Sequence, residues 1–341
     1  MRMFFLTIGY CKYLTALRVC LASVAVALAA CQQHPLGDKM VAEENTYTAY
    51  HTYLKEVESY PFISVASDEL PTGVNAANNI TYVSYGERDL QLDVYYPQAS
   101  TQLLPAIVLV HGGGWRYGYR ENLTPLAQAL AERGIVAATI SYRLSSEALF
   151  PAAIADTHAA IRWLRENAGD YGIDAERIAV GGASAGGQIA SLTGLTAGEV
   201  YFDPAVSSSN TSSEVQAVIN IDGLSDFTSE AARYFEDDPT KNPSAAGAWL
   251  GGRYHQQVER WHRASPIFHV SPSMPPMLFI NSAQQRFSVG QEEMTARMDA
   301  MGVVYRVHAI DNTPHTFWLF NPWLQPTADM IYRFLQEFLT P

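Results

Sequence analysis

Ser184 lies in a run of small residues whose spacing suits a nucleophile. The stretch Gly182-Ala183-Ser184-Ala185-Gly186 has the pattern G-x-S-x-G, in which a strand turns so sharply into a helix that only small side chains fit around the serine. Such a turn places the hydroxyl above the sheet, and the N–H of Ala185 at the helix start can stabilise an oxyanion. The pattern therefore predicts nucleophilic attack on a carbonyl carbon.

A run of three glycines is a second feature that suits acyl chemistry. His111-Gly112-Gly113-Gly114-Trp115 directly follows the apolar stretch AIVLV at 106–110. Because glycine has no side chain, the N–H groups of Gly113 and Gly114 can approach a substrate carbonyl, and we predict that they donate to the oxyanion. We interpret His111 as structural, with its ring hydrogen-bonded to the loop.

His315 is the histidine best placed to act as a general base. Of the nine histidines, it alone lies in the loop after the last expected strand, within DNTPHTFWLF. The chain order serine, acid, histidine places the base in that loop. Its neutral imidazole would accept the serine proton and return it to the leaving alcohol.

The hydrophobic pattern predicts a scaffold of alternating strands and helices for these residues. Residues 80–85 and 90–96 alternate as an antiparallel pair would, and the continuous apolar runs after them indicate buried parallel strands. The expected strands are 80–85, 90–96, 105–110, 135–144, 177–184, 215–223, 274–282 and 303–311, and the expected helices are 123–134, 150–167, 184–195 and 327–339. The fold class is therefore α/β, with a mainly parallel sheet of about eight strands and helices on both faces.

Residues 227–275 do not follow this alternation. We expect them to form a lid-like insertion between the sixth and seventh strands that covers the site. Trp249 and Trp261 within it either shape a substrate cleft or fill a small core.

The first 31 residues have the pattern of a secretory leader. Lys12 and Arg18 precede the apolar run VCLASVAVALAAC at 19–31, which is short for a membrane span. LAAC at 28–31 looks like a bacterial lipobox, which implies cleavage before Cys31 and lipidation of its thiol; the alternative is ordinary cleavage near Ala29 and release of a soluble periplasmic protein. We therefore expect an exported protein, either periplasmic or an outer-membrane lipoprotein.

Charge and cysteine content exclude several partners. The net charge of −12 argues against binding to nucleic acid. All three cysteines lie within the leader, so the main body has neither a disulfide framework nor a zinc-thiolate site. We expect residues 32–78 to be a stalk or accessory segment with a helix around 43–58, and residues 79–341 to be the catalytic domain.

With these motifs in view, residues 80–341 resemble the α/β-hydrolase superfamily. The resemblance is to hormone-sensitive-lipase-like carboxylesterases and bacterial feruloyl and acetyl esterases, and it rests on HGGGWRYG at 111–118 and on the stretch from 141 to 192 that ends in GASAGGQIASL. It implies that Ser184 is the nucleophile and His315 the base. It also implies that the N–H groups of Gly113, Gly114 and Ala185 form the oxyanion hole, with Arg143 and Pro151 supporting the active-site loops.

The triad acid departs from the family pattern. Members usually carry it just after the seventh strand, but residues 281–286 here read NSAQQR and contain no carboxylate. We expect Asp222 to replace it, because the end of the sixth strand is adjacent to the usual position. The alternatives are Asp226, Glu292, Asp311 or a serine-histidine dyad, and Asp222 could instead belong to a simple Asp-Gly turn.

Aromatic and basic residues near the motifs suggest the substrate. The opening of the site is predicted to be aromatic, which suits a sugar or an aryl group, because Trp115, Tyr117, Phe317 and Trp318 lie beside the motifs. Three arginines lie near the predicted opening: Arg116, Arg120 and Arg286. They either bind an anionic group such as a uronate or pair with the acids of EDDP at 236–239. The expected substrate contacts are Trp115, Arg116, Arg286 and Trp318.

The motifs NSAQQRF, TPHTFWLFNPW and INIDG further resemble secreted bacterial hydrolases that act on plant-wall polysaccharides. This resemblance implies an exported serine carboxylic ester hydrolase that removes acetyl groups, or as a second choice methyl or feruloyl groups, from a carbohydrate such as pectin or xylan. No metal or organic cofactor is implied. Two alternatives stay open: an esterase of small esters or lipids or an arylformamidase, and a non-catalytic module that binds polysaccharide.

Overall fold

The computed structural model describes residues 47–339. The leader, the lipobox with Cys31 and the first part of the 32–78 segment lie outside the described residues. Among the described residues, no helix combines the length and the apolar character needed to cross a membrane.

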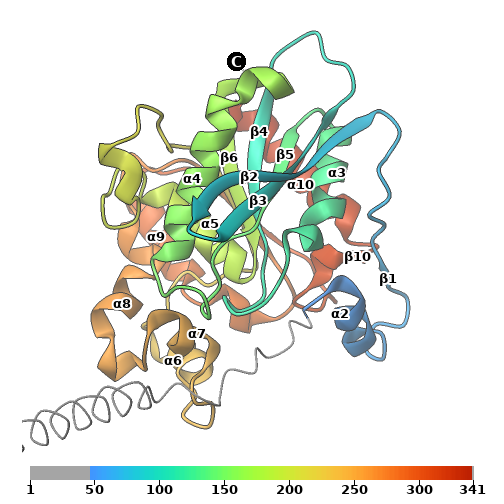
Figure 1. Ribbon diagram of the computed structural model, residues 1–341. Helices are drawn as coiled ribbons and strands as arrows, with labels where there is room; N and C mark the ends of the chain where they lie inside the picture. Colours follow the sequence, from blue (N-terminus) through green and yellow to red (C-terminus); the bar gives the residue numbers. More distant parts are fainter. Residues whose placement is uncertain (1–46, 340–341) are drawn as a thin grey trace, which may run out of the picture. The chain divides into compact units, whose positions relative to one another are not determined.

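An eight-stranded sheet forms the centre of this part of the chain (Figure 1). Its spatial order is β2, β3, β5, β4, β6, β7, β8, β9. β3 pairs antiparallel with β2 and β5, and all the other neighbours are parallel. The predicted mainly parallel sheet of eight strands is confirmed. The strands are β2 (Val74–Tyr85), β3 (Arg88–Pro97), β4 (Leu104–Val110), β5 (Val136–Ile140), β6 (Ile173–Ala183), β7 (Ala217–Ile221), β8 (Met277–Asn281) and β9 (Tyr305–Ala309).

Helices cover both faces of the sheet because alternate strand residues point to opposite sides. Val108 and Val110 of β4 pack into a core with α4 (Ala152–Glu166), α5 (Ala185–Leu195) and α9 (Gln291–Met301). Ile107 and Leu109 of the same strand pack into a second core with α3 (Thr124–Glu132) and α10 (Leu324–Leu339). The side chains of both cores are buried, so a site that is open to substrate lies at the strand ends or in the loops. Short 3-10 helices span Arg120–Leu123, Ala168–Tyr171, Pro204–Ser207, Tyr254–Gln256, Pro266–His269, Gln285–Ser288 and Phe317–Leu319.

The predicted insertion between the sixth and seventh strands consists of three short helices. These are α6 (Glu230–Glu236), α7 (Ala245–Leu250) and α8 (Val258–Arg263), which lie together below the sheet in Figure 1. Trp249 and Trp261 are completely buried. Both tryptophans pack into the same core as Val108 and Val110, and neither lines the cavity beside Ser184.

Residues 47–78 differ from the expected stalk, because they pack against the catalytic domain. The helix α2 (Ala49–Glu56) contacts β10 (Phe320–Asn321) through the rings of Tyr53 and Phe320, whose centroids are 6.5 Å apart. β1 (Ser64–Val65) pairs antiparallel with β10. The first sheet strand begins at Val74, before the predicted boundary at residue 79. Buried Ile63, Ala66 and Val74 explain the difference, since their side chains complete the second core.

Candidate active site

Ser184 sits at the turn between β6 and α5, in a backbone conformation that side chains rarely adopt. Its φ is 56° and its ψ is −123°, and its N–H donates to the carbonyl of Ile221 at 2.8 Å. Small neighbours make this possible: a Cβ on Gly186 would lie 2.0 Å from the carbonyl oxygen of Val110. The local sequence therefore forms the sharp turn that the G-x-S-x-G pattern predicts.

The structure brings Ser184, His315 and Asp222 into one hydrogen-bonded chain. Nε2 of His315 lies 2.8 Å from Oγ of Ser184, and Nδ1 lies 2.6 Å from Oδ2 of Asp222. An ionised carboxylate only accepts hydrogen bonds, so Nδ1 carries the ring hydrogen and Nε2 is free to accept from the serine. This is the arrangement of a Ser-His-Asp triad.

Asp222 occupies the acid position for a reason that is visible in the sheet. It follows β7, and its Oδ1 accepts a hydrogen bond from the N–H of Ser282, which follows the neighbouring strand β8, at 3.0 Å. The loop that lacks a carboxylate thus contributes a donor to the acid of the adjacent strand. The other three carboxylates are elsewhere: Asp226 accepts from the N–H groups of Thr228 and Ser229, and Glu292 and Asp311 are exposed.

Burial and aromatic rings set the state of His315. Burial lowers the pKa of the imidazole below its ordinary value, and the hydrogen bond and charge of Asp222 partly oppose that shift. Phe287 stacks on the ring with centroids 3.3 Å apart and an interplanar angle of 10°. A base with a lowered pKa is neutral near pH 7, which is the form that can accept the serine proton.

Trp318 supports this ring instead of lining a substrate pocket. Its indole is 2% exposed and meets the imidazole edge-on, with centroids 5.2 Å apart. The neighbouring Phe317 is fully buried. Neither Trp318 nor Phe317 lines the cavity beside Ser184, and both belong to the second core.

The glycine run reaches the serine from the end of β4. A Cβ on Gly112 would lie 3.0 Å from the Cβ of Ser184, so the loop passes directly beside the nucleophile. Gly114 and Ala185 line the cavity next to Ser184, and Gly113 is the residue before Gly114 in the chain. The N–H groups of these three predicted donors have no hydrogen-bond acceptor among residues 47–339. They are available to an oxyanion.

His111 has the structural role that the sequence suggested. Its Nδ1 lies 2.8 Å from the carbonyl oxygen of Gly112, and its ring stacks on Tyr142 with centroids 4.4 Å apart. Burial lowers the pKa of His111 to about 4. The ring holds the glycine loop as a neutral, buried group.

A cavity of about 100 Å³ opens beside Ser184. Its lining includes four residues that the sequence did not predict to contact substrate, because nothing local marks their side chains as facing a distant serine. The missed residues are Leu224, Glu236, Ala245 and Phe287, and the others are Gly114, Trp115, Ser184, Ala185, Asp222 and Arg286.

Trp115 is mainly a core residue with one edge at this cavity. The side chain is 4% exposed, stacks on Trp249 with centroids 5.2 Å apart, and donates from Nε1 to Gln188 at 2.9 Å.

Of the three arginines considered, only Arg286 lines the cavity. It forms an ion pair with Glu236 at 3.1 Å. Arg120 is buried and bonds Asp93 at 2.8 Å, which makes it structural. The Arg116 guanidinium lies 5.4 Å from the ring centroid of Tyr117, and this residue does not line the cavity. The alternative in which an arginine pairs with the EDDP acids therefore holds for Arg286.

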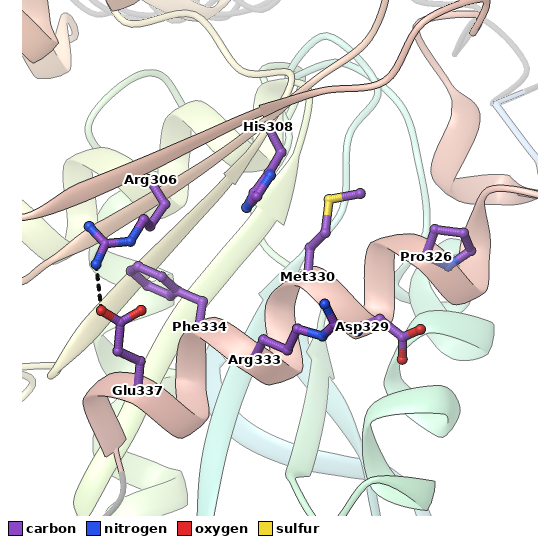
Figure 2. Close-up of a pocket in the computed structure, with 8 residues that line it drawn as sticks. All are labelled: Arg306, His308, Pro326, Asp329, Met330, Arg333, Phe334 and Glu337. Atoms are coloured by element: carbon purple, nitrogen blue, oxygen red, sulfur yellow. Dashed lines mark hydrogen bonds and ion pairs between the residues drawn. The ribbon is translucent and has the colours of Figure 1, made fainter.

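A wider groove of about 450 Å³ lies between β9 and α10, outside the site (Figure 2). Its two ion-paired residues, Arg306 and Glu337, approach within 2.5 Å of each other. The lining contains no serine and no residue of the hydrogen-bonded chain at Ser184. This groove has no candidate nucleophile, so the acyl chemistry belongs to the cavity at Ser184.

The fold and this site define an α/β-hydrolase. The chain belongs to the BD-FAE family, whose model matches residues 92–292, more than half of the chain. Carboxylesterase NlhH of Mycobacterium tuberculosis is 40% identical over 122 residues, which are 36% of this chain and 38% of NlhH. The probable carboxylic ester hydrolase LipM of the same organism is 31% identical over 261 residues, 73% of this chain and 56% of LipM.

A solved structure with the same fold covers most of the chain. A truncated form of a carbohydrate esterase from gut microbiota aligns with a TM-score of 0.63 at 22% identity, covering 80% of this chain and 100% of that one. The likeness shows a shared fold. The chain spans about half of the length of LipM and less than half of the length of NlhH.

Proposed function

We propose that this protein is a serine carboxylic ester hydrolase that removes acetyl groups from a carbohydrate, with pectin and xylan as the first polymers to test. The observation that carries the proposal is the chain of contacts from Ser184 Oγ through His315 to Asp222, beside backbone N–H groups that have no acceptor among residues 47–339. The names of NlhH and LipM, both described as ester hydrolases, support the same class of reaction.

The proposed reaction passes through an acyl-enzyme. Oγ of Ser184 attacks the ester carbonyl while its proton passes to Nε2 of His315. The N–H groups of Gly113, Gly114 and Ala185 stabilise the oxyanion. His315 then protonates the alcohol as it leaves, and later takes a proton from the water that releases the acid and regenerates Ser184.

The size of the cavity favours a short acyl group. Its volume of about 100 Å³ is smaller than that of an engineered cavity of roughly 150 Å³ that holds one benzene molecule. Trp115, Leu224 and Ala245 give this cavity an apolar wall. An acetyl group fits such a space, whereas a feruloyl group or a long acyl chain needs far more, so we place acetyl first.

Acetate release by the purified protein tests this function. Acetylated pectin, acetylated xylan and p-nitrophenyl acetate are offered to the wild type and to Ser184→Ala. We expect turnover in the wild type and a loss of about a thousandfold or more in the variant. A folded wild type that is no faster than Ser184→Ala on any of these esters would contradict the hydrolase and favour the non-catalytic binding module.

We also propose that the protein is exported and attached to a membrane through a lipid on Cys31. The support is the apolar leader and LAAC at 28–31. In a bacterial host, the full chain should partition into detergent, and Cys31→Ala should move it to the aqueous phase. Equal partition of both forms would contradict lipidation, and recovery of the variant from the periplasm would still support export.

A further inference from the structure

An ion pair lies in the cavity beside Ser184, and the hydrolytic steps above do not use it. Nη2 of Arg286, in the loop after β8, donates to Oε1 of Glu236 at 3.1 Å, and both residues line the cavity. The Glu236 side chain, at the end of α6, is 8% exposed. Burial of a carboxylate costs free energy unless its oxygens are hydrogen-bonded, so a second partner is expected for it.

Each member of the pair has a polar atom to offer. Oε2 of Glu236 takes no hydrogen bond from a described residue. Nε of Arg286 is buried and has no acceptor in the described part of the chain. An acceptor and a donor near each other suit a hydroxyl, which donates and accepts through one oxygen. They suit an anion poorly, because Glu236 neutralises the Arg286 charge and would repel a second carboxylate.

The ring of Phe287 links this pair to His315, the residue that protonates the leaving alcohol. The leaving oxygen takes its proton from His315, and Phe287 stacks on that imidazole. The Arg286 guanidinium lies over the same Phe287 ring, 4.9 Å from its centroid. The apolar wall at Leu224 and Ala245 is then left for the acyl group.

We propose that Glu236 and Arg286 form a subsite for a hydroxyl group next to the ester, on the alcohol half of the substrate; this rests on the hydrolase function proposed above. The substrate class is an acylated polyol, such as a neutral sugar with a free hydroxyl beside its acetyl group. Glu236 accepts the hydroxyl hydrogen, and Arg286 donates to the hydroxyl oxygen. An alkyl ester would displace water from Glu236 and Arg286 without giving either of them a hydrogen-bond partner, so its kcat/KM should be much lower.

Two matched esters test the subsite with the purified full chain. 2-Hydroxyethyl acetate and propyl acetate differ by a hydroxyl in place of a methyl group. The ratio of their kcat/KM values, divided by the ratio of their alkaline hydrolysis rates, removes the difference in intrinsic reactivity. We expect a corrected wild-type ratio of about 10 or more in favour of the hydroxyl. A ratio near one would overturn the subsite while leaving the hydrolase intact, whereas no hydrolysis of these two esters or of the three acetates above would overturn both.

Substitution of Glu236 separates recognition from support. Glu236→Gln keeps the shape of the side chain but removes its charge, and we expect the corrected ratio to fall about tenfold. Glu230→Gln changes an exposed glutamate on the same helix and should leave the ratio as it is. If Glu236 only holds Arg286 and Phe287 in place, Glu236→Gln lowers kcat/KM for both esters equally. An unchanged ratio in a folded variant would overturn the proposal.

Discussion

His315 is the residue at which geometry, burial and charge act together. Its two ring nitrogens face Ser184 Oγ at 2.8 Å and Asp222 Oδ2 at 2.6 Å. Phe287 on one ring face and Trp318 at the edge leave the imidazole little freedom to rotate. Asp222 therefore acts on both the orientation and the pKa of this base, while the rings of Phe287 and Trp318 limit its rotation.

The pH dependence of hydrolysis should follow the lowered pKa of His315. Only the neutral imidazole accepts the serine proton, so kcat/KM is lost as the pH falls through that pKa. Because burial holds the pKa below the ordinary value of 6.5, we expect the acid limb of the profile to lie below 6.5. A profile of kcat/KM for p-nitrophenyl acetate measures it, and a limb at or above 6.5 would contradict the description of this base.

Asp222→Asn should remove most of the activity without unfolding the protein. An amide in this position can donate to Nδ1 and so stabilise the wrong ring tautomer, which leaves Nε2 protonated and unable to accept. We expect kcat to fall by about 10³ to 10⁴-fold.

Asp311→Asn is the matched control, since Asp311 is exposed in the loop before His315. Its kcat should equal that of the wild type. A full loss in Asp311→Asn with activity retained in Asp222→Asn would assign the acid to the other carboxylate.

At the scale of elements, the site depends on the parallel strands ending together. Ser184 follows β6 and Asp222 follows β7, and these strands are neighbours in the sheet. The His315 loop follows β9, which is next to β8. Carboxyl ends of parallel strands meet at one edge of the sheet, so loops from distant parts of the sequence converge there.

Gly186→Ala tests how closely α5 must approach β4. The new Cβ would lie 2.0 Å from the carbonyl oxygen of Val110 and 2.5 Å from that of His111, which are backbone atoms that cannot move aside cheaply. We expect the free energy of unfolding to fall by about 2–4 kcal/mol, measured by urea denaturation.

Gly169→Ala is the control for this substitution, because an added Cβ there has no atom within 4 Å. Its urea midpoint should stay close to that of the wild type. Equal midpoints for the two variants would show that the turn tolerates a side chain at 186.

At the scale of the whole described chain, residues 47–78 complete the domain that holds the site. Ile63, Ala66 and Val74 are buried in the core formed with α3 and α10. Asn122 also donates to the carbonyl oxygen of Tyr47 at 2.9 Å, which ties the start of this segment to the chain near the glycine loop.

A chain that begins at residue 79 should therefore be much less stable than one that begins at residue 46. Loss of residues 46–78 exposes apolar surface of the second core, which lowers the free energy of unfolding by about 25 cal/mol for each Å². Thermal unfolding of the two forms compares them, and we expect a clearly lower Tm for the shorter one. Equal Tm values would show that residues 46–78 are an independent accessory segment after all.

Motifs that act within a few residues of each other could be predicted from the sequence. The strand, the turn at Ser184 and α5 are contiguous, and steric limits at small residues apply wherever they occur. The same holds for the glycine run after β4 and for the alternation that predicts eight strands. Ser184 could therefore be identified as a candidate nucleophile without information on the tertiary structure.

Long-range contacts could not be predicted in this way. Trp318 and Phe317 are buried, although the sequence predicted that they line the opening of the site. The local sequence does not show whether an aromatic side chain beside a motif packs into the core or faces a substrate. The pairing of Arg286 with Glu236, 50 positions earlier, neutralises the charge of the arginine that lines the cavity, and the local sequence could not show this.

The sequence by itself determined the α/β class, the nucleophile turn, the glycine loop and the base, because these follow from local sterics and from hydrophobic periodicity. Only the tertiary structure decided that Asp222 faces His315 across 93 positions of the chain, and that Glu236 and Phe287 reach the cavity at Ser184. The physical reason is that a hydrogen bond or a ring contact depends on distance in space, and the sheet order, which brings β7, β8 and β9 together, sets that distance.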